Sequence, residues 1–435
     1  MSDELPEHIG KYQIIRQIGK GATSQVFLGV DPLTEQQVAI KLINFGKPQD
    51  ARSAKVIRKL LLTEVSLAGK LQHPHIVAIY DAAITGDGGY LAMEYVAGGT
   101  LERHISADTL LPIAGVVEIV FKCCKALDYA YRNGVIHRDI KPANILMGGP
   151  NTSDIKVSDF GAAQVLFRDS TQISRIGSPL YMSPQQAAEE SPLNHQTDIF
   201  SLGVVMYQLL CGKLPFNAKS LAAMLYQIIH VDPPAPSTFR PEIPASLDRI
   251  VAKMLQKTLV ARYLSWDELT HDLAAVGAFA VDERNIADSE KFSLLREMNF
   301  FDGFDDVELW EVLHISYWNK YPPRKKIIEE GGKGDSFYML AGGEVKILKD
   351  SNLITTLKAG DCFGEMAYLS RPAMPRSASV ETVGEVTVME ISAEALDRAS
   401  DNCQLAFNKA FLNILVQRLH HADIQMTNMF NAYKV

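Results

Sequence analysis

The 435-residue sequence has few cysteines and no long hydrophobic run, and both absences narrow what the chain can be. Its five cysteines lack metal-ligand spacing and are too sparse for a disulfide-stapled fold: Cys123, Cys124, Cys211, Cys362 and Cys403. No apolar stretch approaches the ~18–20 residues that cross a bilayer, so we predict no membrane-spanning helix. The N-terminal residues MSDELPEHIGK lack the apolar centre of a signal peptide, and we expect a cytoplasmic location.

Positive charge is not in excess either. Lys and Arg number 43 against 51 Asp and Glu, a net charge of −8, and no basic stripe indicates a nucleic-acid partner. Hydrophobic residues make up 47% and charged residues 22%, which is typical of globular proteins and argues against disorder. At roughly 100–200 residues per domain, the length predicts two or three domains.

The first part of the chain changes its periodicity near residue 95. Runs of β-branched and aromatic residues predict strands over 12–18, 25–30, 37–43, 75–80 and 89–95. A helix is predicted over 51–71, and helical periodicity dominates from about 100 to 275, for example over 113–133, 196–210 and 247–257. The pattern predicts an α+β domain over 10–275, with a strand-rich lobe over 10–95 and a helical lobe over 96–275.

The last part of the chain follows polar residues 276–291, which we interpret as a linker. A helix predicted over 307–315 precedes short, glycine-punctuated strands over 326–329, 336–341, 343–348, 354–358, 377–381 and 385–391. This spacing predicts a β-barrel or jelly roll with flanking helices, in a domain over 292–420. A final apolar helix is expected over 403–421, followed by a tail over 421–435.

Residues 18–27, IGKGATSQVF, place Gly19 and Gly21 between two predicted strands. Backbone without a Cβ can approach phosphate oxygens closely, although an ordinary hairpin turn explains these glycines equally well when they are taken alone. Lys41 ends the next apolar strand, where a buried ammonium needs a partner such as Glu64 on the predicted helix. A surface lysine and an exposed glutamate are the alternative.

The segments HRDIKPANIL, residues 137–146, and DFG, residues 159–161, are more specific. Asp139 can accept the proton of a substrate hydroxyl, and Lys141 can place positive charge near a transferred phosphoryl group. Asn144 and Asp159 offer the oxygen ligands that Mg²⁺ prefers. Such a set suits phosphoryl transfer, which depends on alignment and electrostatic stabilisation.

These motifs, in this order and at this spacing, resemble the eukaryotic-like serine/threonine protein kinases over residues 10–275. The resemblance implies a two-lobed fold that binds ATP and Mg²⁺ between its lobes and phosphorylates Ser or Thr in protein substrates. It assigns Lys41 to the phosphates with Glu64 as its ion-pair partner, and it makes Asp139 the proton acceptor. The residues that it assigns to the phosphate loop and adenine pocket are Gly19, Gly21, Val26, Ala39, Met93, Glu94, Tyr95 and Val96.

The sequence departs from the family pattern at Ser24, which replaces a glycine, and at Gln185 in Ser-Pro-Gln. Gln185 replaces the glutamate that would pair with Arg262, so a charge-assisted bond is lost and we expect a less firmly anchored activation segment in an active enzyme. That segment contains Ser170, Thr171, Ser174 and Ser178. Phosphorylation received by Arg138 is one interpretation of these residues, and solvated loop hydroxyls are the other.

A second site is predicted in residues 360–379, GDCFGEMAYLSRPAMPRSAS. The Glu365 carboxylate can accept hydrogen bonds from ribose hydroxyls, and the Arg376 fork can hold a phosphate bidentately. The backbone amides of Gly364, Glu365 and Ala367 can complete the anion cradle. Arg371 competes with Arg376 for the phosphate role.

This segment resembles the phosphate-binding cassette of cyclic-nucleotide-binding domains, and the likeness extends over about 292–420. The resemblance implies cAMP or cGMP as an effector, and the Ser377 hydroxyl does not choose between the two bases. Phe430 or Tyr433 would supply an aromatic lid, unless both belong to a packed or frayed C-terminal helix.

The sequence as a whole predicts a cyclic-nucleotide-regulated serine/threonine kinase whose partners are protein substrates and the nucleotide. Two alternatives remain: a pseudokinase scaffold with a ligand-sensing domain, and an active kinase whose sensor has lost nucleotide binding. In the second alternative the sensor serves to form a homodimer through the last helix.

Overall fold

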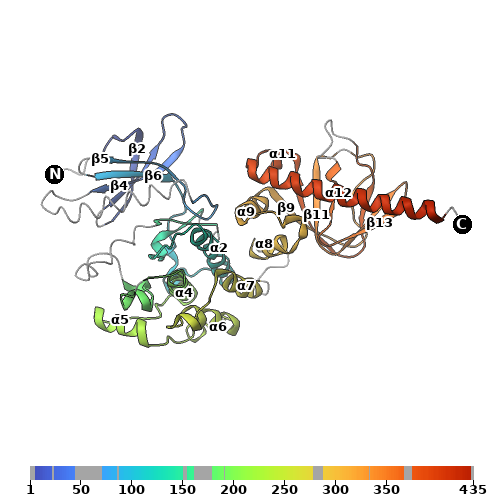
Figure 1. Ribbon diagram of the computed structural model, residues 1–435. Coiled ribbons are helices and arrows are strands. Elements are labelled where there is room, and N and C mark those ends of the chain that lie inside the picture. Colours follow the sequence, from blue (N-terminus) through green and yellow to red (C-terminus); the bar gives the residue numbers. More distant parts are fainter. Residues whose placement is uncertain are drawn as a thin grey trace. The chain divides into compact units, whose positions relative to one another are not determined.

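The computed structural model divides into two compact units, Met1–Val281 and Asp282–Val435 (Figure 1). It describes residues 5–21, 24–44, 71–85, 88–149, 154–160, 179–190, 192–277, 288–332, 334–366 and 375–432. Among these residues, no helix has the length and apolar character needed to span a bilayer.

The first unit opens with a six-stranded antiparallel sheet in the order β1-β2-β3-β4-β6-β5. Its strands are β1 (His8–Ile9), β2 (Tyr12–Lys20), β3 (Ser24–Val30), β4 (Gln37–Asn44), β5 (Ile79–Thr85) and β6 (Gly88–Glu94). The strands predicted over 12–18, 25–30, 37–43 and 89–95 are confirmed to within two residues. Residues 51–70 of the predicted helix lie outside the described part of the chain.

The strand predicted over 75–80 is wrong in position, because β5 begins only at Ile79. The preceding residues pair elsewhere: Ile76 forms an isolated bridge with Val157, and the Val77 amide donates to the Val157 carbonyl at 2.9 Å. The β-branched residues of this stretch therefore satisfy their backbone groups on another segment, which periodicity alone does not reveal.

The other described residues of the first unit are mostly helical, apart from a small hairpin of β7 (Ile145–Met147) and β8 (Ile155–Val157). The α-helices are α2 (Ile113–Arg132), α3 (Pro184–Ala187), α4 (Gln196–Cys211), α5 (Leu221–His230), α6 (Ala245–Met254) and α7 (Trp266–Gly277). Short 3₁₀ turns are η1 (Leu101–His104), η2 (Ala107–Thr109), η3 (Pro142–Asn144), η6 (Pro179–Tyr181), η7 (Pro236–Thr238) and η8 (Leu259–Ala261). Every residue of α4 is buried, and its polar side chains have hydrogen-bond partners, such as the Leu259 carbonyl for Gln196 and the Tyr181 hydroxyl for Gln208. Gly212 ends the helix in a left-handed conformation with φ 70°.

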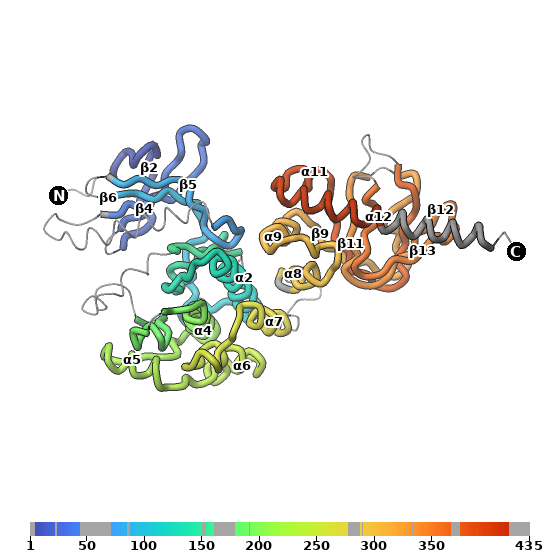
Figure 2. Tube along the Cα trace, in the orientation of Figure 1, coloured from blue at the N-terminus to red at the C-terminus, as the bar shows by residue number. Residues whose placement is uncertain are grey.

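The second unit contains two four-stranded antiparallel sheets, β10-β15-β12-β13 and β14-β11-β16-β9, arranged as a jelly roll (Figure 2). Its strands are β9 (Ser316–Tyr321), β10 (Lys326–Ile328), β11 (Ser336–Gly342), β12 (Glu344–Lys349), β13 (Asn352–Lys358), β14 (Cys362–Phe363), β15 (Ser379–Thr382) and β16 (Val386–Ser392). Its helices are α8 (Asp288–Glu297), η9 (Asn299–Phe301), α9 (Asp306–Ile315), α11 (Ala393–Asp397) and α12 (Asp401–Ala432). The predicted fold class, a two-lobed α+β domain followed by a jelly roll with helices, is confirmed.

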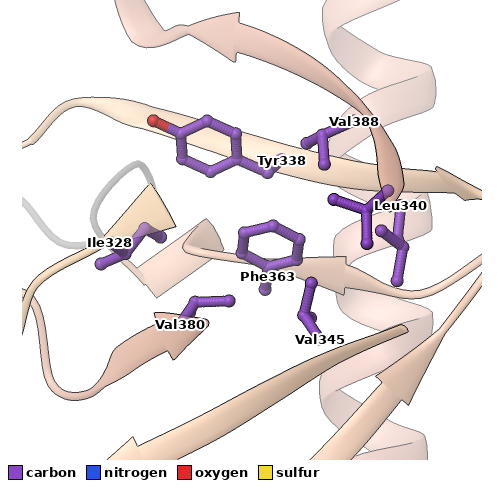
Figure 3. Packing of buried hydrophobic residues seen from close by; sticks show 8 residues of the cluster. Ile328, Tyr338, Leu340, Val345, Phe363, Val380 and Val388 are labelled. Carbon is purple, nitrogen blue, oxygen red and sulfur yellow. The ribbon is translucent and has the colours of Figure 1, made fainter. Parts of the chain in front are cut away.

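The core of the jelly roll lies between the two sheets (Figure 3). Tyr338 and Phe363 stack with their ring centroids 5.2 Å apart and an interplanar angle of 12°. Both sheets contribute to the buried cluster, whose members are Ile328, Tyr338, Leu340, Val345, Phe363, Val380, Val386 and Val388. This core supports β14 and the residues that follow it, which belong to the predicted nucleotide site.

The structure differs from the predictions at three places: the end of the final helix, the linker and strand β9. The final helix continues to Ala432 rather than ending at 421, because residues 401–432 contain no glycine or proline that would stop it. Helices α7 and α8 extend into both ends of the predicted linker. Strand β9 was not predicted, since SYWNKY has three polar residues and lacks flanking turn residues on its N-terminal side.

Candidate functional site

The buried carboxylate of Asp198 holds the catalytic loop predicted at residues 137–146 in place. Asp198, in the first turn of α4, accepts the backbone N–H of His137 at 2.8 Å and that of Arg138 at 2.7 Å. Burial raises the pKa of the Asp198 carboxyl, while His137 and these amides act in the opposite direction. Arg138 has φ 66°, a conformation that non-glycine residues rarely adopt, and the two bonds to Asp198 hold it there.

His137 joins the loop to the segment before Asp159. Its Nε2 lies 2.9 Å from the Ser158 carbonyl, and its Nδ1 accepts the Asp139 backbone N–H at 3.3 Å. An Nδ1 that accepts leaves Nε2 as the donor to the Ser158 carbonyl. The imidazole therefore orients the loop.

Three side chains that were predicted to be catalytic, those of Asp139, Lys141 and Asn144, lie in contact in this loop. The Lys141 ammonium lies 2.7 Å from Asp139 Oδ2, and Asn144 Nδ2 donates to the Asp139 carbonyl at 2.8 Å and to Oδ2 at 3.1 Å. Because the Asn144 amide nitrogen is directed at Asp139, its side-chain oxygen is the atom suited to bind a cation. The Asp139 side chain keeps 36% of its exposure, so a substrate hydroxyl can reach it.

Asp159 is brought to the same place by the β7–β8 hairpin. Ile145 pairs with Val157, and the Ser158 backbone N–H donates to the Asn144 carbonyl at 2.9 Å, so residues 144 and 159 leave the hairpin side by side. Lys41 Nζ lies 2.6 Å from Asp159 Oδ1. Burial pushes the pKa of Asp159 upward, but the charge and hydrogen bond of Lys41 outweigh it, and the pKa lies below its ordinary value.

The predicted partner of Lys41, Glu64, lies outside the described residues, as do the activation-segment hydroxyls at 170, 171, 174 and 178. The structure adds Asp159 as a partner of Lys41 that the sequence did not indicate, because 118 residues separate the two. Asp159, like Arg138, has a positive φ, 62°. Of the two residues with positive φ, Arg138 directly precedes Asp139 in the chain and Asp159 contacts Lys41.

The predicted adenine pocket is a cluster of apolar side chains from β3, β4, β6 and the segment after it. Ala39 and Met93 are buried within it, and Val26 and Val96 pack against them. Leu146 of β7 belongs to the same cluster and was missed by the sequence analysis. Its position two residues after Asn144, in a short apolar strand, was the signal that could have found it.

The remaining predicted nucleotide residues lie around this cluster. Gly19 pairs with Val26 across β2 and β3, and the Gly21 N–H donates to the Ser24 carbonyl at 2.7 Å, so the glycine loop turns tightly. The Glu94 side chain has partners other than a nucleotide, because its carboxylate lies 3.1 Å from Lys156 Nζ and accepts the Ala78 N–H. Only the backbone of Glu94 is therefore suited to pair with adenine.

Gln185 and Arg262 are in contact, as their alignment with the family pattern predicts. The buried Arg262 guanidinium donates from Nη2 to Gln185 Oε1 at 3.1 Å, and its other acceptors are the backbone carbonyls of Gln196, Gln256 and Lys257. Burial lowers the pKa of Arg262 to about 10. Neutral oxygens offset only part of the free energy needed to remove the Arg262 cation from water.

The second predicted site centres on Arg376, whose side chain is buried in the second unit. Its Nη1 donates to the Gly364 carbonyl at 3.0 Å and its Nη2 to the Ser336 carbonyl at 2.8 Å, while the guanidinium carbon lies 6.0 Å from the Tyr338 ring centroid. The backbone of Arg376 pairs with Gly331 and Gly332. These contacts fix the guanidinium beside the loop that follows β14.

The other members of the predicted cassette flank Arg376. Gly364 has φ 80°, and a Cβ there would lie 2.9 Å from Arg376 Nη1, so the close approach requires glycine. Glu365 is buried next to it, and Ser377 is exposed. Ala367 and Arg371 lie outside the described residues, as does Tyr433, and the side chain of Phe430 is likewise not described. The structure thus brings Gly364 and Arg376 into contact.

Comparison with known families agrees with the fold of both units. Residues 12–273 match the family described as protein kinase domain, and residues 318–403 match the family described as cyclic nucleotide-binding domain. The chain belongs to the protein kinase family, and it carries a cyclic nucleotide-binding domain after the kinase domain.

Curated relatives point the same way. The serine/threonine-protein kinase PrkC of Bacillus subtilis is 34% identical over 280 residues, 63% of this chain and 42% of its own length. PknB of Mycobacterium leprae is 36% identical over 62% of this chain and 44% of its own length. A probable serine/threonine-protein kinase of Clostridium acetobutylicum is 27% identical over 91% of this chain and 60% of its own length. The chain therefore spans about half the length of the curated relatives it matches.

Proposed function

We propose that the chain is an active serine/threonine protein kinase, which transfers the γ-phosphoryl group of Mg-ATP to Ser or Thr hydroxyls of proteins. The observation that carries this proposal is the convergence of Lys41, Asp139, Asn144 and Asp159, four polar side chains drawn from three separate segments. Lys141 adds a second positive charge at Asp139. The serine/threonine kinases among the relatives support the same activity.

The donor set fits Mg²⁺. Asn144 offers an amide oxygen and Asp159 a carboxylate whose pKa is lowered, and both are the hard ligands that this ion prefers. The described residues contain no group of three or more acidic, His or Cys side chains able to hold a metal alone. That agrees with an ion that takes one or two protein ligands and completes its shell with phosphate and water. Bound there, Mg²⁺ would neutralise phosphate charge.

The roles of the side chains follow from their positions. Lys41 orients the α- and β-phosphates, and Val26, Ala39, Met93 and Leu146 enclose the adenine. Asp139 accepts the proton of the attacking hydroxyl, while Lys141 offsets charge on the transferred group. Alignment and electrostatic stabilisation supply the rate enhancement, because phosphoryl transfer needs little covalent participation from the protein.

We further propose that the second domain binds cAMP or cGMP and regulates the kinase. Arg376 would hold the cyclic phosphate, Glu365 the ribose, and Ser377 lies exposed beside them. Regulation requires that the nucleotide bind one arrangement of the chain better than another. In our proposal the nucleotide-free sensor inhibits the kinase, and binding relieves that inhibition.

The test is transfer of radiolabelled phosphate from ATP to a generic basic protein, with and without each cyclic nucleotide. Labelling that a cyclic nucleotide stimulates supports both proposals. Labelling that neither nucleotide changes at saturation contradicts the regulatory proposal and favours a sensor that has lost its ligand. Absence of labelling under all conditions favours the pseudokinase scaffold.

The partners proposed for the chain are protein substrates, the cyclic nucleotide and a second copy of itself, bound through the final helix. We propose a cytoplasmic location and no nucleic-acid partner, in keeping with the acidic net charge of −8.

A further inference from the structure

Strand β8 carries one charged side chain between two buried apolar ones. Ile155 and Val157 are fully buried, and Lys156 points to the opposite face of the β7–β8 hairpin, as alternation along a strand requires. Lys156 pairs with Leu146 across the hairpin, so their side chains share one face, with Cβ atoms about 4.5–5.5 Å apart. Leu146 belongs to the apolar cluster assigned above to the adenine. The stem of Lys156 therefore lies beside the predicted adenine pocket.

The Lys156 ammonium has two partners from other segments of the first unit. It donates to the Pro74 carbonyl at 2.7 Å and lies 3.1 Å from Glu94 Oε2. The Lys156 side chain is 22% exposed and that of Glu94 is 26% exposed, so both charges are largely removed from water. Solvent and salt screen such a pair less than an exposed surface pair, and its loss has a correspondingly larger effect.

Glu94 is the last residue of β6 and the first of the segment whose backbone we assign to adenine. Its N–H donates to the Ala78 carbonyl at 2.8 Å, and its Oε2 accepts the Ala78 N–H at 3.3 Å. The same carboxylate oxygen contacts Lys156. Backbone and side chain of Glu94 are thus both held, and one of the contacts comes from β8.

Residues 74–78 complete a closed arrangement with β8 and Glu94. The Val77 N–H donates to the Val157 carbonyl at 2.9 Å, and the Val157 N–H donates to the His75 carbonyl at 2.9 Å. Backbone bonds therefore join β8 to this segment, and further bonds join the segment to Glu94 through Ala78. The contact of Lys156 with Glu94 closes the ring, and a substitution at Lys156 can remove it while every backbone bond stays.

We propose that Lys156 is a positioning residue for ATP, which acts through Glu94 to hold the backbone that pairs with adenine. Contacts to adenine are the same before and during phosphoryl transfer, so their loss raises KM for ATP and leaves kcat almost unchanged. A role through Asp159, which lies three residues further along the chain, would lower kcat instead. The inference rests on the kinase activity proposed above.

The test is steady-state phosphoryl transfer by the full chain over a range of ATP concentrations. Lys156→Met removes the charge and keeps most of the stem, and we expect KM for ATP to rise by about 3–10-fold, with a kcat change below about twofold. Lys156→Arg keeps the charge and should return KM to within about twofold of the wild type. Lys253→Met is the matched control, because it removes an ion pair with Glu268 in the helical lobe and should leave KM for ATP unchanged.

A second variant tests whether Lys156 acts through Glu94. Glu94→Gln keeps the shape of the side chain and its acceptor for the Ala78 N–H, and it should raise KM for ATP by a similar factor. The two substitutions together should raise KM little more than either one alone, because both remove the same contact. Glu94→Gln also decides the question if thermal unfolding shows that Lys156→Met is poorly folded.

Calorimetric titration with Mg-ADP measures the same contact without phosphoryl transfer, and Lys156→Met should weaken this binding by the factor seen in KM. A fall in kcat at constant KM, an unchanged affinity in both variants, or fully additive effects of the two substitutions would each overturn the inference. A wild type that binds Mg-ADP but transfers no phosphate refutes the proposed activity, and the Mg-ADP affinities of the variants then decide the role of Lys156. A wild type that binds no Mg-ADP overturns both.

Discussion

The Lys41 ammonium lies 2.6 Å from the Asp159 carboxylate, although 118 residues separate them in the sequence. The pair joins strand β4 to the segment after β8, and so connects the parts of the candidate site to which we assign the phosphates and the metal ion. Binding of Mg-ATP would replace this contact, since Lys41 would turn to phosphate and Asp159 to the cation. Each partner thus holds the other in place until substrate arrives.

Lys41→Met should therefore abolish most phosphoryl transfer. Loss of its charge at the phosphates should lower kcat/KM by about 100-fold or more, since a charged hydrogen bond contributes about 1.5–3 kcal/mol and the substrate loses its alignment as well. The measurement is steady-state transfer to a protein substrate. Lys11→Met is the matched control, because Lys11 forms an ion pair of 2.7 Å with Asp31 in the same lobe, away from the site. Equal loss in both variants would contradict the role of Lys41.

Gln185→Glu should stabilise the first unit. The buried Arg262 guanidinium has neutral oxygen partners, and a carboxylate at position 185 would turn its bond to Gln185 into an ion pair, at the loss of the bond that Gln185 Nε2 donates to the Lys257 carbonyl. We expect the free energy of unfolding to rise by about 1 kcal/mol. Thermal unfolding of the full chain measures it, with Gln185→Leu as the comparison that removes the bond and lowers stability. A fall in stability for Gln185→Glu would mean that burial of the carboxylate outweighs the new ion pair.

Lys257 should make the stability of the folded chain depend on pH in alkaline solution. Its ammonium donates to the Ile228 carbonyl at 2.8 Å and lies 4.0 Å from the Phe216 ring, and burial lowers its pKa from 10.5 to about 8. Between these two values the unfolded chain binds more protons than the folded one, so this group makes stability rise with pH.

Lys257→Met removes that contribution. The unfolding temperature of the wild type, relative to the variant, should increase from pH 8 towards pH 10 and change little below pH 7. Differential scanning fluorimetry over this range provides the measurement, and Lys219→Met, at an exposed lysine, is the control. A constant difference across the range would show that Lys257 titrates at the same pH in both states.

Gly334→Ala should weaken cyclic-nucleotide binding without unfolding the domain. A Cβ at this position would overlap Arg376 Nη2, which is the end of a flexible side chain, so the arginine must move away from the Ser336 carbonyl. We expect an affinity loss of about 10–100-fold for cAMP and cGMP, on the scale of one charged hydrogen bond.

The matched control for this variant is Gly384→Ala, since a Cβ there meets nothing within 4 Å. Calorimetric titration with each nucleotide should show wild-type affinity for the control. Unchanged affinity in Gly334→Ala would argue that Arg376 does not hold the phosphate.

The sequence predicted most of the fold because the strands and helices around the sites carry strong local periodicity. It placed β2, β3, β4 and β6, and it identified the jelly roll from its glycine-separated strands. It failed at β5 and β9, where the pairing partner decides the conformation: residues 76 and 77 bond to Val157, and β9 is completed by β16. Local pattern does not contain such long-range choices.

For the candidate site, too, the sequence predicted what lies within short segments but not the long-range contacts. Motif spacing identified Asp139, Lys141, Asn144 and Asp159, because their chemistry is carried by short, contiguous segments. The pairing of Lys41 with Asp159 and the place of Leu146 in the predicted adenine pocket depend on how the strands and the segments after them come together in space.

The most direct test of the kinase proposal is transfer of radiolabelled phosphate from Mg-ATP by wild type and Asp139→Asn, at equal concentrations and with cyclic nucleotide present. Asparagine preserves the shape of the side chain but cannot accept the hydroxyl proton, so the rate should fall by about 10²–10⁴-fold. Asp108→Asn, at an exposed position in η2, should retain the wild-type rate. Phosphoryl transfer by Asp139→Asn at the wild-type rate would contradict the account.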